Sequence, residues 1–103
     1  MQAEVKVLNF MITKSYGEKW NKSKVRVNAC TTKKNNSNAS KGYFSIEKSF
    51  EMTGFHSKNT TEMYSRDFTF NDDEKANVGD NLKLKFTLVE GTTFEFRGMA
   101  FCP

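Results

Sequence analysis

Apolar and polar residues alternate with a period of two along most of this chain. The clearest stretch is NLKLKFTLVEG, where Leu82, Leu84, Phe86 and Leu88 alternate with polar residues. Successive side chains of a β-strand point to opposite faces, so this pattern predicts a strand with one buried face, and Phe86 is expected in the core. Similar patterns predict six strands, within residues 5–12, 24–30, 42–52, 64–70, 81–91 and 92–101.

Three local features refine these strands. Residues 5–12 carry apolar side chains in both phases, which is typical of a strand buried on both faces or nearly so. Lys48 interrupts an otherwise apolar face formed by Phe44, Ile46 and Phe50. In the last strand the apolar phase changes at Gly98, and a glycine at a phase change predicts a β-bulge.

The segments between the strands are short and polar. Glu90-Gly91 predicts a tight hairpin between the last two strands, and SYGEKWNKS predicts a longer hairpin between the first two. The stretch TTKKNNSNASKG links the second strand to the third. NDDEKANVGD predicts a turn of helix that Asn71 or Asp72 caps and Gly79 ends.

These elements define the expected fold class. The chain has 103 residues, enough for one domain, and no stretch shows helical apolar spacing over three turns. We therefore expect an all-β fold: a single antiparallel domain of about six strands covering residues 1–103. The pattern allows either a small barrel of the OB type or a two-layer sandwich.

Several classes of chemistry find no support in the sequence. The chain contains no nucleophile, phosphate-binding or metal-ligand motif, and its one histidine, His56, lies in a polar segment expected to be solvated. The acidic run at Asp72, Asp73 and Glu74 fits a helix start better than a calcium loop. We expect a protein that binds rather than catalyses, without a metal or cofactor.

The chain ends and the cysteines predict a location. No apolar run reaches the length of a membrane span, and the first residues lack the pattern of a secretory signal. We therefore expect a cytoplasmic protein that contacts no membrane, with Cys30 and Cys102 as free thiols.

Positive charge gathers in the first part of the chain. The net charge is +4, but residues 1–60 hold eleven Lys/Arg against four Asp/Glu, and the remaining residues hold five against eight. This asymmetry favours an anionic partner. The stretch SYGEKWNKSK places the only tryptophan, Trp20, among lysines, with Tyr16 nearby.

The basic aromatic stretch has two interpretations. Aromatic rings stack on bases and lysines neutralise phosphates, so this loop, with KKNNSNASKGYF as an opposite wall, predicts a site for single-stranded nucleic acid. Alternatively, Trp20 folds back as a lid on the core while the lysines stay solvated. The candidate nucleic-acid-binding residues are Tyr16, Lys19, Trp20, Lys22, Lys24, Arg26, Lys33, Lys34, Lys41 and Tyr43.

A second functional class requires no nucleic acid. A small β domain with free strand edges can bind a protein partner by strand pairing, or through aromatic anchors such as Tyr16 and Trp20. The alternative prediction is thus a protein-binding module, or an inhibitor encoded by a virus or phage.

Overall fold

The computed structural model describes residues 4–35 and 42–103, without the side chains of residues 34, 35 and 42–44. It confirms the six predicted strands and adds one short 3-10 turn, η1; these described residues contain no α-helix. In chain order the elements are β1 (Val7–Lys14), η1 (Glu18–Trp20), β2 (Lys24–Asn35), β3 (Gly42–Thr53), β4 (Glu62–Thr69), β5 (Asn81–Glu90) and β6 (Glu95–Cys102).

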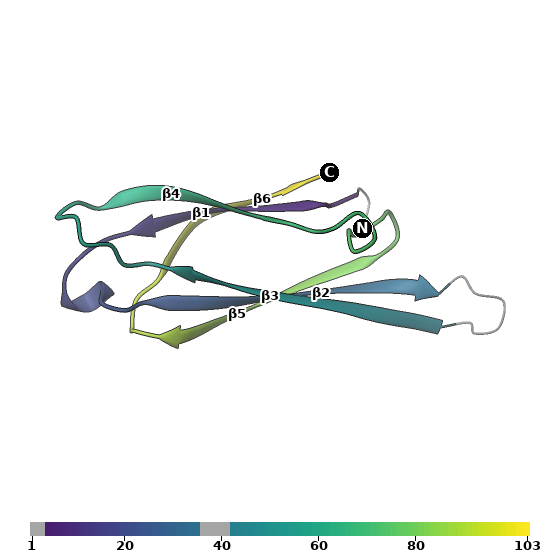
Figure 1. Cartoon of the computed structure of the whole chain (residues 1–103), viewed down its shortest axis with the longest axis horizontal. Helices are drawn as coiled ribbons and strands as arrows, with labels where there is room; N and C mark the ends of the chain where they lie inside the picture. The colour runs from purple at the N-terminus through teal and green to yellow at the C-terminus, as the bar shows by residue number, and fades with distance from the viewer. Residues whose placement is uncertain (1–3, 36–41) are drawn as a thin grey trace.

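The strands form two layers. One three-stranded sheet has the order β4-β1-β6 and the other the order β3-β2-β5, with antiparallel pairing throughout both sheets. Figure 1 shows the two sheets facing each other as an elongated sandwich. The fold is therefore an all-β, two-layer sandwich and not a closed barrel.

The core lies between the central strands of the two sheets. Leu8, Phe10 and Ile12 of β1 are almost fully buried, and they face Val25, Val27 and Ala29 of β2. On the outer face of β1, Val7 and Met11 are half-buried, so this strand comes close to being buried on both faces. Burial is greatest here because a central strand has a neighbour on each side and a sheet above one face.

Two predicted hairpins are wrong. β5 pairs with β2 and β6 pairs with β1, so the turn at Gly91 crosses from one sheet to the other. The connection through η1 crosses between β1 and β2 in the same way. A short link suits such a crossing because packed sheets lie only about 10 Å apart. Gly91 has φ +79°, and a Cβ there would lie 2.6 Å from the Cα of Ser23, so this crossing requires glycine.

Two further expectations concern local structure. The predicted bulge is confirmed, because the register of β6 against β1 shifts so that Met11 pairs with Gly98 and Ile12 with Phe96. The predicted helical segment reduces to a single turn, in which the amides of Glu74 and Lys75 both donate to the carbonyl of Asn71. The chain then forms a bridge between Ala76 and Val5, which ends any helix.

Candidate binding surface

The predicted nucleic-acid residues fall at opposite ends of the sandwich. Lys24 begins β2, whereas Lys33 and Lys34 lie close to its other end. At roughly 3.3 Å per residue these ends are about 30 Å apart, and Figure 1 shows η1 and the far ends of β2 and β3 at opposite extremes. The expected arrangement of two facing walls is therefore wrong. Lys41 lies outside the described residues, as do the side chains of Lys34 and Tyr43.

Lys33 serves the fold rather than the surface. Its side chain is only 10% exposed, and its Nζ donates to Oδ2 of Asp80 at 3.1 Å and to the carbonyl of Lys75. Oδ2 of Asp80 also accepts the amide of Asn77 at 2.8 Å. This buried ion pair ties the segment after β4 to the inner face of β2, which removes Lys33 from the phosphate-binding set.

The end of the sandwich that carries η1 keeps the other candidates together. Tyr16 is 43% exposed, and Lys19 and Lys22 are also exposed. Trp20 and Lys24 are half-buried, so the ring is neither a fully covered lid nor a fully open platform. Arg26 lies further along β2, where its guanidinium donates to Glu51 at 3.3 Å.

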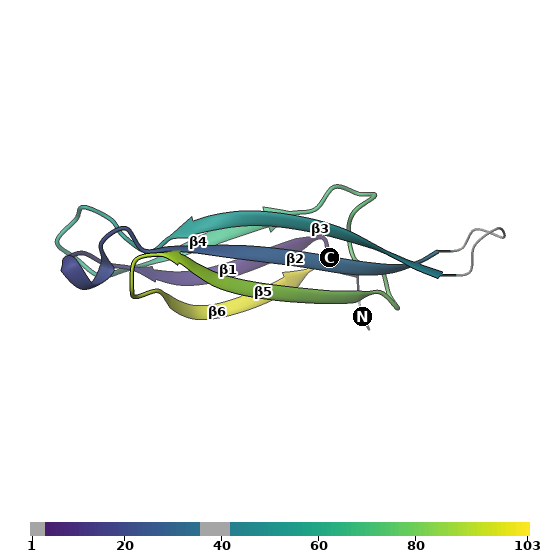
Figure 2. The same ribbon diagram turned by 90° about the horizontal axis from the view of Figure 1, so that it is seen from below.

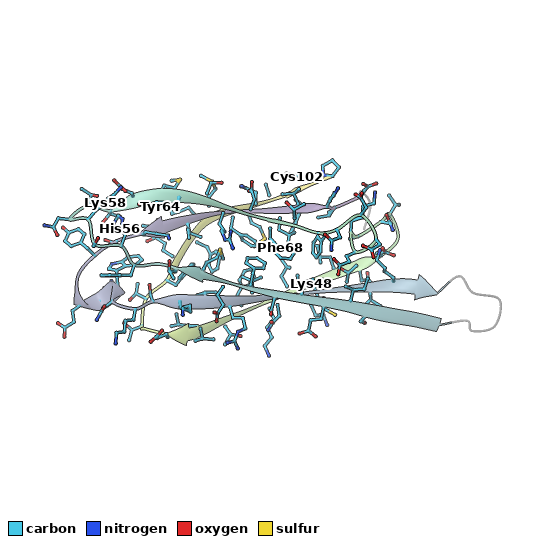
Figure 3. The ribbon with its side chains drawn as sticks, viewed as in Figure 1. Lys48, His56, Lys58, Tyr64, Phe68 and Cys102 are labelled. Atoms are coloured by element: carbon cyan, nitrogen blue, oxygen red, sulfur yellow. The ribbon has the colours of Figure 1, made fainter. Side chains whose placement is uncertain are left out.

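A polar cluster near the same end was not predicted from the sequence. His56 is not a solvated side chain: it is 10% exposed, and its Nδ1 lies 3.1 Å from the hydroxyl of Tyr64, which donates to Glu62 at 2.9 Å. Lys58 adds an ion pair to Glu62 at 3.4 Å, and Figure 3 shows His56, Lys58 and Tyr64 gathered together. The cluster ties the segment between β3 and β4 to β4.

Hydrogen bonding sets the protonation behaviour of this cluster. The hydroxyl of Tyr64 holds the pKa of Glu62 below its usual value, and the same bond raises the pKa of Tyr64. The charge of Glu62 raises the pKa of Lys58. These shifts keep the carboxylate ionised and the phenol protonated, which suits a structural clasp.

The two long sides of the sandwich differ in chemistry. Figure 2 shows β3 and β4 along one side and β5 and β6 along the other. On the β3/β4 side the rings of Phe50 and Phe68 stack across the sheets, with centroids 4.6 Å apart. Beside them Lys48, which faces inward opposite Ala29, pairs with Glu74 at 2.5 Å. The predicted exception at Lys48 is thus an ion pair that closes this side; Lys48 and Phe68 are labelled in Figure 3.

The β5/β6 side has no such closure. Leu82 and Leu84 at one end of β5 pack against the core, but five other inward-facing apolar side chains remain 38–52% exposed. We call this surface the β5/β6 strip; it consists of Phe86, Leu88, Phe96, Met99 and Phe101. Phe86 faces inward as predicted, but it is 39% exposed, so its full burial was a wrong expectation. β5 and β6 are both edge strands of their sheets, so no neighbouring strand covers the outer side of these rings.

The strip lies between two free backbone edges. Within the described residues β5 pairs only with β2, and β6 pairs only with β1. Each strand therefore leaves one row of amide and carbonyl groups without a strand partner. On the outer face of β5, Lys83 and Lys85 are exposed and make no ion pair with any described residue. On β6, Arg97 pairs with Glu95 at 2.8 Å.

Residues 4–35 and 42–103 contain no cluster of three or more His, Cys, Asp or Glu side chains placed to hold a metal ion. Cys30 and Cys102 are free, as expected. Nowhere in the described part of the chain does a helix reach the length and apolarity needed to span a membrane.

No family model, curated protein or solved structure matches this chain.

Proposed function

We propose that this domain is a non-catalytic binding module that contacts another protein through the β5/β6 strip. The observation that carries the proposal is the contrast between the two long sides of the sandwich. The β3/β4 side is closed by the Phe50–Phe68 stack and the Lys48–Glu74 ion pair. The β5/β6 side leaves five large apolar side chains partly in water.

Contiguous exposed apolar side chains are typical of contact surfaces. Phenylalanine and methionine are enriched at protein interfaces, where a few such residues supply most of the binding energy. Phe96, Met99 and Phe101 come from a single strand and point the same way, so one partner surface can cover all three. Burying them would remove from water apolar surface that the domain itself leaves exposed.

The test compares matched surface variants in a capture experiment. Immobilised wild type is incubated with nuclease-treated extract from the source cells, beside Met99→Gln/Phe101→Gln and the control Met63→Gln. Met63 is an exposed methionine on β4, away from the strip. We expect a protein that binds wild type and the control but not the strip variant. Calorimetry with the purified partner should then show the same order of affinities for the three proteins. Equal retention of a partner by wild type and both variants would contradict the proposal.

A second candidate function is binding of single-stranded nucleic acid at the η1 end. It is supported by the exposure of Tyr16 beside Lys19 and Lys22, with Trp20 in the same turn. Quenching of Trp20 fluorescence by oligothymidylate that weakens as salt is raised would support it. Unchanged fluorescence at micromolar oligonucleotide would exclude it and leave the strip as the working surface.

A further inference from the structure

The edge of β5 carries a more specific inference, which rests on the proposed function. We propose that the partner contributes an extended strand that pairs with the free edge of β5. This strand has apolar side chains on the face toward the strip and acidic side chains on the face beside Lys83 and Lys85. The partner is thus recognised by both its backbone and its alternation of apolar and acidic residues.

β5 is the better of the two edges for strand addition. Its register against β2 is regular from Asn81 to Leu88 and shifts only at the last pair, near Glu90. β6 is interrupted in its middle, where the register shift leaves Arg97 without a partner in β1. A bulge disrupts the row of backbone groups and hinders pairing with another strand. The long uninterrupted edge therefore belongs to β5.

The side chains of β5 specify what an added strand must carry. Residues directly opposite each other in an antiparallel pair lie on the same face of the sheet. Positions opposite Leu84, Phe86 and Leu88 therefore point inward, toward the exposed rings of β6. Positions opposite Lys83 and Lys85 lie on the outer face, where two ammonium groups that no described residue pairs with favour carboxylates.

A second copy of this chain fits the same edge poorly. A two-fold pairing of β5 with its copy about Leu84 sets Lys83 opposite Lys85, and a pairing about Lys85 sets that lysine opposite itself. A pairing about Phe86 sets Lys85 opposite Thr87. None of these registers gives either lysine an acidic neighbour directly opposite, and like charges in opposite positions destabilise a pair. Charge complementarity therefore favours an acidic strand of another protein.

The test uses synthetic peptides as the probe. The first is a fluorescein-labelled peptide of alternating Glu and Val, and its counterparts replace Glu by Lys, group the same residues into blocks, or methylate alternate backbone nitrogens. We expect the alternating acidic peptide to bind by fluorescence anisotropy and to shift the amide resonances of β5. Each counterpart should bind at least about tenfold more weakly, because it loses the charge match, the alternation or the backbone pairing.

Charge reversal of the edge supplies the matched variant. Lys83→Glu/Lys85→Glu should prefer the Lys peptide over the Glu peptide, whereas Lys19→Glu/Lys22→Glu, with the same change in net charge, should keep the wild-type preference. All four lysines are exposed, and circular dichroism verifies that both variants remain folded. Identical behaviour of the two variants would overturn the inference, because binding would then reflect net charge alone.

Further outcomes separate this inference from the proposed function. If the alternating acidic peptide does not bind, but a captured protein still depends on Met99 and Phe101, strand addition is overturned and the protein-binding function stands. If the peptide shifts amide resonances only at the η1 end, the inference is overturned, because the peptide then binds there by simple electrostatic attraction. Sedimentation as a dimer that Lys83→Glu/Lys85→Glu disrupts would also overturn it, by making the occupant a second copy of the chain.

Discussion

The ring of Phe86 in β5 meets the ring of Phe96 in β6 across the two sheets, with centroids 4.9 Å apart and planes inclined at 70°. Each ring is nearly two-fifths exposed, although both face inward. On the opposite side, Phe50 and Phe68 stack at 4.6 Å next to an ion pair. One side of the sandwich is therefore closed by charged groups, and the other ends in apolar rings that reach water.

Two phenylalanines on the inner faces should differ in their effect on stability. Phe10 is fully buried between Phe50 and Phe86, so we expect Phe10→Ala to lower the free energy of unfolding by about 3–5 kcal/mol. Phe86→Ala should cost about 1–2 kcal/mol, because the exposed part of its ring gains nothing from folding. Urea unfolding of both variants measures the difference. Equal losses would mean that β5 is not an edge strand.

The ion pair between Lys33 and Asp80 should show strong coupling. Both side chains are about nine-tenths buried, so removing one charge leaves the opposite charge inside the protein without this ion pair. We expect Lys33→Met and Asp80→Asn each to cost about 3–5 kcal/mol. The double variant should cost clearly less than the sum of the two. A double-mutant cycle by urea unfolding tests this coupling, and additive effects or single losses below about 1 kcal/mol would argue against it.

The Lys48–Glu74 pair should make the domain sensitive to acid. The hydrogen bond from Lys48 lowers the pKa of Glu74 in the folded protein. A lowered pKa adds stability that is present above the unfolded value of about 4.3 and is lost as pH falls through the folded value. We therefore expect wild type to lose more stability between about pH 5 and pH 3 than Lys48→Met loses.

The measurement for this pair is the urea midpoint at pH 7, 5, 4 and 3 in both proteins. Asp72 and Glu62 also have lowered pKa values, so wild type and variant share that part of the acid dependence. Only the difference between the two curves reports on Glu74. Parallel curves over the whole range would show that the ion pair does not close the β3/β4 side in solution.

The strands were predictable because each carries its own signal. Alternation located all six, and the phase change at Gly98 located the bulge. Which strands share a sheet was not predictable from this pattern. A short connection such as Glu90-Gly91 serves equally well as a hairpin or as a crossing between layers, and alternation indicates the face of a residue without its position in the sheet. The exposure of Phe86 depends on that position.

The polar contacts could not be predicted from the sequence for a different reason. Lys33 and Asp80 are 47 residues apart in the chain, and nothing near either residue marks it as buried. Lys48 was visible as an exception on an apolar face, but its partner Glu74 lies in a segment that looked like a solvated helix start. Within the predicted basic aromatic site, Tyr16, Lys19, Trp20 and Lys22 lie together only because they are close in the sequence.

The methionines allow the most direct test of the β5/β6 strip. Met52 is 3% exposed, Met63 on β4 is 54% exposed, and Met99 in the strip is 41% exposed. Their intrinsic reactivity toward hydroxyl radicals is the same, so oxidation rates read by mass spectrometry compare their access to solvent. Met63 serves as the open reference and Met52 as the closed one.

The decisive measurement is therefore radical footprinting of the free domain and of the domain saturated with the alternating acidic peptide. We expect Met99 to oxidise nearly as fast as Met63 in the free domain and to slow several-fold with the peptide, while Met63 stays unchanged. A free domain in which Met99 is as slow as Met52 would contradict an open strip. A peptide complex in which Met99 keeps its rate would contradict the strip as the binding surface.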